Sequence, residues 1–175
     1  MDEETEAAME SLARKLLGDA VDRDLTPFQS AKRILEVGVQ GNGLMFTEAD
    51  DDWHPMIITV GPNSSVGDLT EVAGFDEMSR AIVSLVGQPG TLAASLLLNT
   101  WAKDPVTRER IYEQLIMFVV DHETTAVWTS RINRYEDRPP TLEPWNLETG
   151  FNEESPPCRA LRLGMEISRE AGVHG

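Results

Sequence analysis

Apolar residues at helical spacing predict two helices at the start of the chain. In the first, apolar residues recur at intervals of three and four, the spacing of one helix face: Met9, Leu12, Ala13, Leu16, Leu17 and Ala20. The second begins at Thr26, which can cap it, with Pro27 tolerated at the first position and Gln29 able to complete a capping box. We therefore expect a helical hairpin over about residues 5–39.

Short apolar runs of strand length follow these helices. Residues 44–47 and 56–60 predict a β-hairpin around the acidic loop 48–55. Residues 61–65, Gly-Pro-Asn-Ser-Ser, have the composition of a turn. A third helix is predicted over about residues 76–86, where apolar residues again recur at helical spacing.

The second half of the chain is dominated by strand patterns. Residues 111–120 and 126–134 are rich in β-branched and aromatic residues and predict a hairpin. Residues 91–101 fit a buried strand or a buried helix, and the polar end of this run favours a strand. The Pro-rich residues 139–157 predict an irregular connection. Residues 161–168 alternate between apolar and polar, which predicts a final strand.

This order of elements predicts an α+β fold. A helical hairpin at the N-terminus and one further helix would pack on a mostly antiparallel sheet of about five or six strands. The length of 175 residues fits a single domain over residues 1–175, and no linker divides the chain.

Composition bears on the compartment. Cys158 is the single cysteine, so an internal disulfide is impossible and a reducing, cytoplasmic environment is expected. One neighbouring arginine does not make a reactive thiolate, so we expect an inert thiol. No apolar run approaches the roughly 20 residues that span a bilayer, and we expect no membrane association.

The net charge of −15 bears on which kinds of partner the protein can bind. It disfavours direct nucleic-acid binding, which depends on clustered Lys and Arg. Residues 34–79 contain no base and nine acids: Glu36, Glu48, Asp50, Asp51, Asp52, Asp68, Glu71, Asp76 and Glu77. We interpret this stretch as a solvated surface or, more specifically, as a docking face for a basic protein.

Nucleotide and metal motifs are incomplete. Residues 38–43 and 87–91 lack the spacing and the lysine of phosphate-binding loops. One cysteine and three histidines show no zinc spacing, and the acidic loop lacks the glycine and glutamate of an EF-hand. We expect no cofactor. A looser divalent-cation site at Glu48, Asp50, Asp51 and Asp52 is an alternative to a solvated loop.

Two histidines lie beside carboxylates. His122 stands between Asp121 and Glu123, which would raise the pKa of its imidazole, and His54 follows the aspartates of the acidic loop. Each is interpreted as part of a polar loop, with a catalytic or metal role as the alternative. The two would share a site only if both loops lie at the same end of the sheet.

The tryptophans divide into two pairs. Trp101 and Trp128 lie in apolar runs and are predicted core residues. Trp53 and Trp145 lie in polar, proline-containing segments, where local packing and contact with a partner are both possible roles.

The preferred hypothesis from the sequence is a non-enzymatic accessory or inhibitory protein. It would bind a basic protein partner through an acidic surface that includes Asp50, Asp51, Asp52, Trp53 and Trp145. The alternatives are a small hydrolase or metal-dependent enzyme that uses His122 or His54, a nucleic-acid-mimicking inhibitor, and a structural subunit of a larger assembly.

Overall fold

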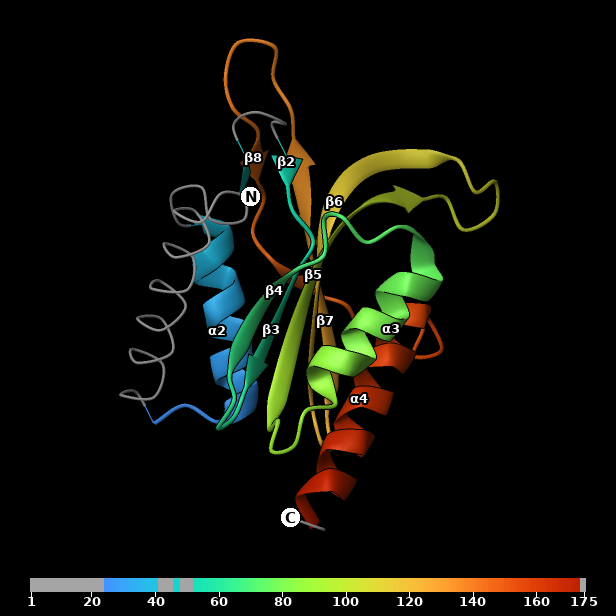
Figure 1. Ribbon diagram of the computed structural model, residues 1–175. Coiled ribbons are helices and arrows are strands. Elements are labelled where there is room, and N and C mark those ends of the chain that lie inside the picture. Colours follow the sequence, from blue (N-terminus) through green and yellow to red (C-terminus); the bar gives the residue numbers. More distant parts are fainter. Residues whose placement is uncertain (1–23, 41–45, 48–51, 174–175) are drawn as a thin grey trace.

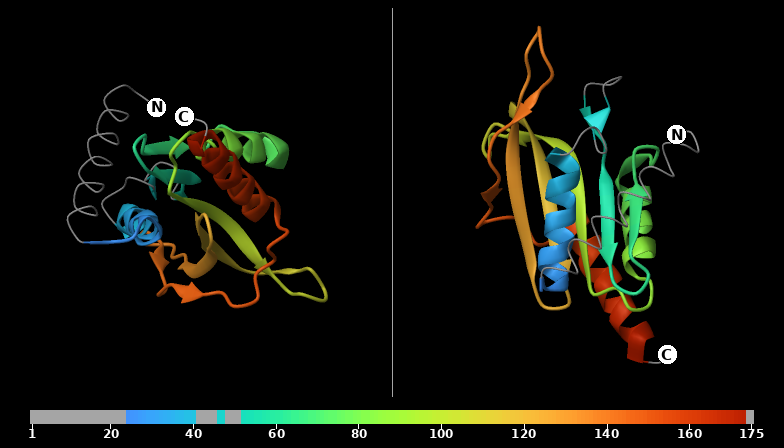
Figure 2. Two further views of the ribbon diagram at one scale, coloured as in Figure 1. Left: turned by 90° about the horizontal axis from the view of Figure 1, so that it is seen from below. Right: turned by 90° about the vertical axis from the view of Figure 1, so that its left-hand side faces the viewer.

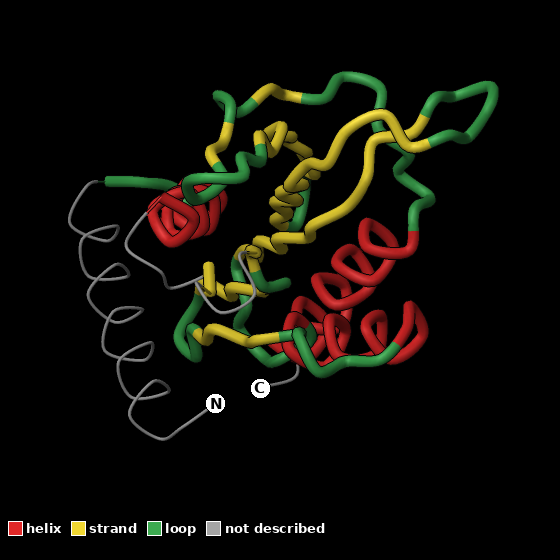
Figure 3. The backbone as a smooth tube through the Cα atoms, turned by 90° about the horizontal axis from the view of Figure 1, so that it is seen from above, coloured by secondary structure: helices red, strands yellow, loops and turns green. Residues whose placement is uncertain are grey.

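A curled antiparallel sheet forms the centre of the molecule. The computed structural model describes residues 24–40, 46–47 and 52–173 (Figure 1). Helix α2 (Pro27–Gln40) lies on one face of the sheet, whereas α3 (Gly74–Val86) and α4 (Pro156–Val173) lie on the other (Figures 2 and 3). The α+β class is confirmed. The predicted helix over residues 5–20 lies outside the described residues.

The main sheet places its strands in the order β4-β3-β5-β6-β7-β8, with β9 also pairing with β7. Its strands are β3 (Met56–Val60), β4 (Ser65–Asp68), β5 (Ala93–Lys103), β6 (Arg110–Asp121), β7 (Thr125–Asn133), β8 (Thr141–Leu142) and β9 (Asn146–Leu147). Two further short strands, β1 (Phe46–Thr47) and β2 (Asp52–Trp53), pair with each other. All of these pairings are antiparallel, as predicted.

The start of α2 confirms the predicted capping box. The backbone N–H of Gln29 donates to Thr26 Oγ1 at 3.2 Å, and the N–H of Thr26 donates to Gln29 Oε1 at 3.0 Å. Two donors that the helix itself cannot satisfy are thereby bonded. The buried face of α2 is apolar, and Ser95 Oγ of β5 donates to the carbonyl of Ala31 at 2.8 Å.

Alternation along the central strands builds a core on each face of the sheet. Leu97 and Met117 belong to the core under α2, while their neighbours Leu96 and Phe118 belong to the core under α3 and α4. Successive side chains of a strand point to opposite faces, so a strand covered on both sides must be apolar at every position. This explains why residues 93–98 are apolar except for Ser95, whose hydroxyl is bonded to α2, and it confirms the predicted strand.

The predicted strand over residues 161–168 is wrong, because this segment lies within α4. The buried residues of α4 follow helical spacing: Cys158, Ala160, Leu161, Gly164, Met165 and Ser168. Leu163 and Ile167, which completed the alternating pattern, are 49% and 39% exposed. Pro156 and Pro157 at the start of the helix were the available signal, because proline is favoured in the first turn.

The predicted pairing of residues 44–47 with residues 56–60 is also wrong. Strand β3 pairs with β4 through the turn at residues 61–64, and its other edge pairs with β5. Thr47 instead pairs with Asp52 of β2. The turn chemistry of residues 61–65 therefore joins two adjacent strands. The predicted hairpin of β6 and β7 is confirmed, with register from Gln114↔Arg131 to Val120↔Thr125.

Two strands extend beyond the body of the molecule as a ribbon, formed by residues 98–103 of β5 and 110–113 of β6 (Figure 1). The pairing of β5 with β3 stops at Leu97, and the pairing of β6 with β7 stops at Gln114. Each ribbon strand therefore has one partner strand. None of the described helices is long and apolar enough to cross a bilayer.

Candidate protein interface

Asp52 joins an ionic network at the base of the ribbon. Arg134, just beyond β7, donates to both carboxylate oxygens of Glu113 at 2.6 and 2.7 Å and to Asp52 Oδ1 at 3.2 Å. Asn99 Nδ2 donates to the same Asp52 oxygen and to Glu113 Oε1. Four segments of the chain meet here, from β2, β5, β6 and the end of β7. Asp52 is therefore paired within the molecule, although it shares the charge of Arg134 with Glu113, and this pairing argues against a free docking charge.

The network shifts the pKa values of its members. The hydrogen bonds and charge of Arg134 lower the pKa of Glu113 from its ordinary value of 4.5, against the opposing effect of burial. The same contact with Glu113 raises the pKa of Arg134. Both groups are thus charged at neutral pH, and the Glu113 side chain is only 13% exposed. This is the arrangement of a structural ion pair.

Trp53 and Trp145 both pack against the core under α2. Trp53 is 7% exposed and belongs to that core, so its ring is not available to a partner in this structure. Trp145 is half-buried against the same residues. For both, local packing is what the structure shows. Asp50 and Asp51 lie outside the described residues.

Trp101 is exposed, so its assignment to the core is wrong. It lies on the ribbon, beyond the part of the sheet that α2 covers, and is 41% exposed. A shift of register after Ala102 pairs Lys103 with Arg110 and leaves Ile111 as the extra residue. The guanidinium carbon of Arg110 consequently lies 5.4 Å from the centre of the Trp101 ring.

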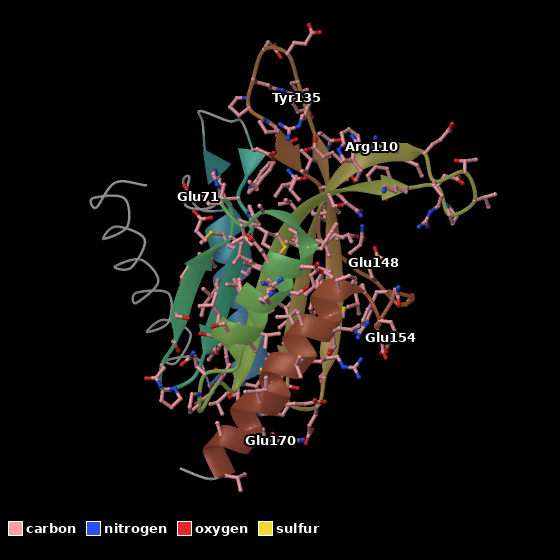
Figure 4. All side chains as sticks on the ribbon, turned by 45° about the vertical axis from the view of Figure 1, so that its right-hand side comes forward. Glu71, Arg110, Tyr135, Glu148, Glu154 and Glu170 are labelled. Carbon is pink, nitrogen blue, oxygen red and sulfur yellow. The ribbon has the colours of Figure 1, made fainter. Side chains whose placement is uncertain are left out.

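Arginine-on-aromatic contacts recur at this end of the molecule. Besides Arg110 on Trp101, Arg131 lies 4.9 Å from the Tyr112 ring and Arg138 lies 3.9 Å from the Tyr135 ring. Figure 4 labels Arg110, at the outer end of the ribbon strands, and Tyr135, in the loop after β7. Significant contacts of this kind occur about once per 70–80 residues, so three at one end are a local enrichment.

The acidic segment, residues 68–77, presents the base-free part of the sequence to solvent. Four of its side chains are exposed carboxylates, those of Asp68, Glu71, Asp76 and Glu77. Among them Phe75 is 70% exposed, an unusual position for a phenyl ring.

Buried contacts and hydrogen bonds hold the acidic segment in place. Leu69 is 2% exposed in the core under α3, and its N–H donates to the carbonyl of Pro55 at 2.9 Å. Asp68 Oδ1 accepts the N–H of Thr70 at 2.8 Å. Asp76 and Glu77 lie in the first turn of α3, where negative charge also stabilises a helix. The segment is thus a supported loop with its carboxylates outward.

His122 lies on the turn between β6 and β7. Asp121 Oδ1 accepts the N–H groups of Glu123 and Thr124 at 2.8 and 2.6 Å, so this carboxylate closes the turn. The three predicted residues Asp121, His122 and Glu123 line a small hollow of about 210 Å³ together with residues of α4. Arg162, Glu166 and Arg169 bring both signs of charge to it.

His54 lies at the other end of the sheet. Its Nδ1 is 2.6 Å from Oγ1 of Thr70, which belongs to the acidic segment. Ala93 of β5 pairs with Asp121, whereas Asn99 of the same strand contacts Asp52. At about 3.3 Å per residue, six positions along β5 separate these ends by about 20 Å. The two histidines therefore do not share a site. The version of the enzyme hypothesis in which both histidines act together requires a shared site.

The predicted cation site and the single cysteine have separate outcomes. Among the described residues, no three His, Cys, Asp or Glu side chains are grouped so as to hold a metal ion. Of the predicted cation site, only Asp52 belongs to that part of the chain. Cys158 is fully buried, and this burial raises the pKa of its thiol.

Comparison with known proteins adds no relative. No family model matches the chain, and no significant match is found among curated proteins or among solved structures.

Proposed function

We propose that the protein is a non-enzymatic accessory or inhibitory protein that binds a basic protein partner through the acidic segment. The observation that carries this proposal is Phe75, 70% exposed among four exposed carboxylates. Aromatic rings surrounded by polar groups are frequent energetic anchors of protein interfaces. Complementary charge would speed association and make it sensitive to salt. Asp50 and Asp51 belong to the same proposal on charge alone.

The surface differs from the one expected from sequence. Trp53 and Trp145 pack inward and Asp52 is paired with Arg134, so these three contribute to the fold. Phe75 takes the place of the tryptophans as the aromatic anchor. Leu69 supports the segment, and a preformed loop loses less conformational entropy on binding than a flexible one.

Affinity capture from host lysate tests the proposal, with two pairs of matched variants of the full chain. Glu71→Lys changes the charge of the acidic segment, and Glu170→Lys makes the same change near the end of α4, as Figure 4 shows. Phe75→Ser removes an exposed ring, and Leu147→Ser removes a 57% exposed side chain on β9. We expect the two variants in the acidic segment to weaken partner recovery by about tenfold or more.

The controls should recover the partner as the wild type does, and added salt should reduce recovery for all of them. A lysate without any partner at low salt would contradict the proposal. Equal losses in Glu71→Lys and Glu170→Lys would also contradict it, because the effect would then come from net charge alone.

A further inference from the structure

Helices α3 and α4 leave a groove on the outer face of the molecule. They lie side by side as the outermost layer on their side of the sheet (Figure 4). Between most of α3 and the first half of α4 is a groove of about 860 Å³, whose apolar residues include Val83, Ala160 and Leu163. Leu163 and Ile167, one turn apart on α4, are 49% and 39% exposed. This is an apolar helix face without a partner among the described residues.

The rim of the groove carries both signs of charge in equal number. Arg80, Arg159 and Arg162 line it together with Asp76, Glu154 and Glu166. The whole chain has a net charge of −15, so this rim is less acidic than the chain as a whole. A strongly basic partner would meet three arginines here, and a strongly acidic partner would meet three carboxylates.

We propose that a second copy of this chain packs on the outer face of α3 and α4 about a two-fold axis. A two-fold interface brings one patch against itself, so a patch with equal numbers of acids and bases can pair every charge. Outside this patch, two copies that each carry a net charge of −15 repel each other, so the balanced patch is the more favourable surface for their contact. The exposed Leu163 of each copy would fill the groove of the other, giving a four-helix contact.

The two helices set the dimensions of this face. Helices α3 and α4 contain 13 and 18 residues, which at 1.5 Å per residue makes them about 20 and 27 Å long. A standard interface buries about 800 Å² on each partner. The acidic segment lies mainly outside the groove and shares only Asp76 with it, so this inference does not rest on the proposed function.

Sedimentation equilibrium of the full chain tests the proposal. We expect the wild type to reach about twice its mass of 19.4 kDa at micromolar concentration. Leu163→Glu should remain at 19.4 kDa, because it places a charge in the groove. Leu147→Glu, an exposed leucine on β9, should behave as the wild type. A wild type that stays monomeric, or a dimer that survives Leu163→Glu, would overturn the proposal.

A charge exchange identifies the surface independently of that hydrophobic variant. One chain carries Arg80→Glu with Arg159→Glu, and another carries Glu154→Arg with Glu166→Arg. Each alone should be monomeric, because like charges would face each other across the axis. Mixed together, they should form a heterodimer. A mixture that stays monomeric would exclude the two-fold pairing, and circular dichroism of each variant checks that it is folded.

Discussion

Gly164 lets α4 approach α3. A Cβ at this position would lie 2.7 Å from Cβ and 2.9 Å from Cγ1 of Val86, in fully buried surroundings. We expect Gly164→Ala to lower the free energy of unfolding by about 1–3 kcal/mol, because the helices must separate or Val86 must shift. Urea unfolding measures the loss.

Gly172 provides a matched control within the same helix. A Cβ at Gly172 would meet no atom within 4 Å. Alanine is the better helix former, so Gly172→Ala should leave stability unchanged or raise it by up to about 1 kcal/mol. Equal destabilisation by the two substitutions would show that packing against Val86 does not determine the effect.

The ion pair of Glu113 and Arg134 makes stability depend on pH. The pKa of Glu113 is lower in the folded protein than its ordinary value of 4.5. Its contribution is therefore present above pH 4.5 and is lost as the pH falls through the folded pKa. Arg134→Gln should cost about 1 kcal/mol at neutral pH, the scale of a partly exposed ion pair, since Arg134 is 37% exposed.

The difference between wild type and Arg134→Gln should shrink as the pH falls below 4.5, because Glu113 then becomes protonated. Urea unfolding at a series of pH values measures it. Arg138→Gln removes the same charge from a residue that contacts Tyr135 instead, so its effect should not follow the titration of Glu113. A constant difference for Arg134→Gln would contradict the assignment.

At the scale of elements, the two halves of β5 should differ in stability. Residues 93–97 have neighbouring strands on both sides and are fully buried, whereas residues 98–103 pair only with β6. Local opening of the ribbon breaks few buried contacts. Hydrogen exchange followed by mass spectrometry should therefore show faster exchange in residues 98–103. Equal protection along β5 would indicate that another element covers the ribbon.

At the scale of the whole molecule, the net charge opposes folding. With a net charge of −15, carboxylates repel one another more in the compact state than in the unfolded chain. Salt screens this repulsion, so raising the ionic strength from about 0.01 to 0.15 M should raise the melting temperature by about 2–5 °C. Thermal unfolding followed by circular dichroism measures the change. A fall would mean that ion pairs such as Arg134–Glu113 outweigh the repulsion.

Some local features were readable from the sequence because neighbouring residues alone decide them. The capping box of Thr26 and Gln29 is one, since both partners lie within one helical turn. The hairpin of β6 and β7 is another, because β-branched runs flank a short polar turn. The class of the fold followed from the order of such elements.

The tertiary structure alone decided features that depend on distant partners. The apolar pattern of residues 161–168 fits both a strand and a helix, and packing of Gly164 against Val86 of α3 accompanies the helix. Trp53 is buried in the core under α2, whereas Trp101 lies on the ribbon beyond that core. Likewise, Asp52 and Arg134 meet only because the fold brings together residues that are 82 positions apart. The periodicity of apolar residues indicates which side chains are buried. Which element covers them depends on packing between residues that are far apart in the sequence.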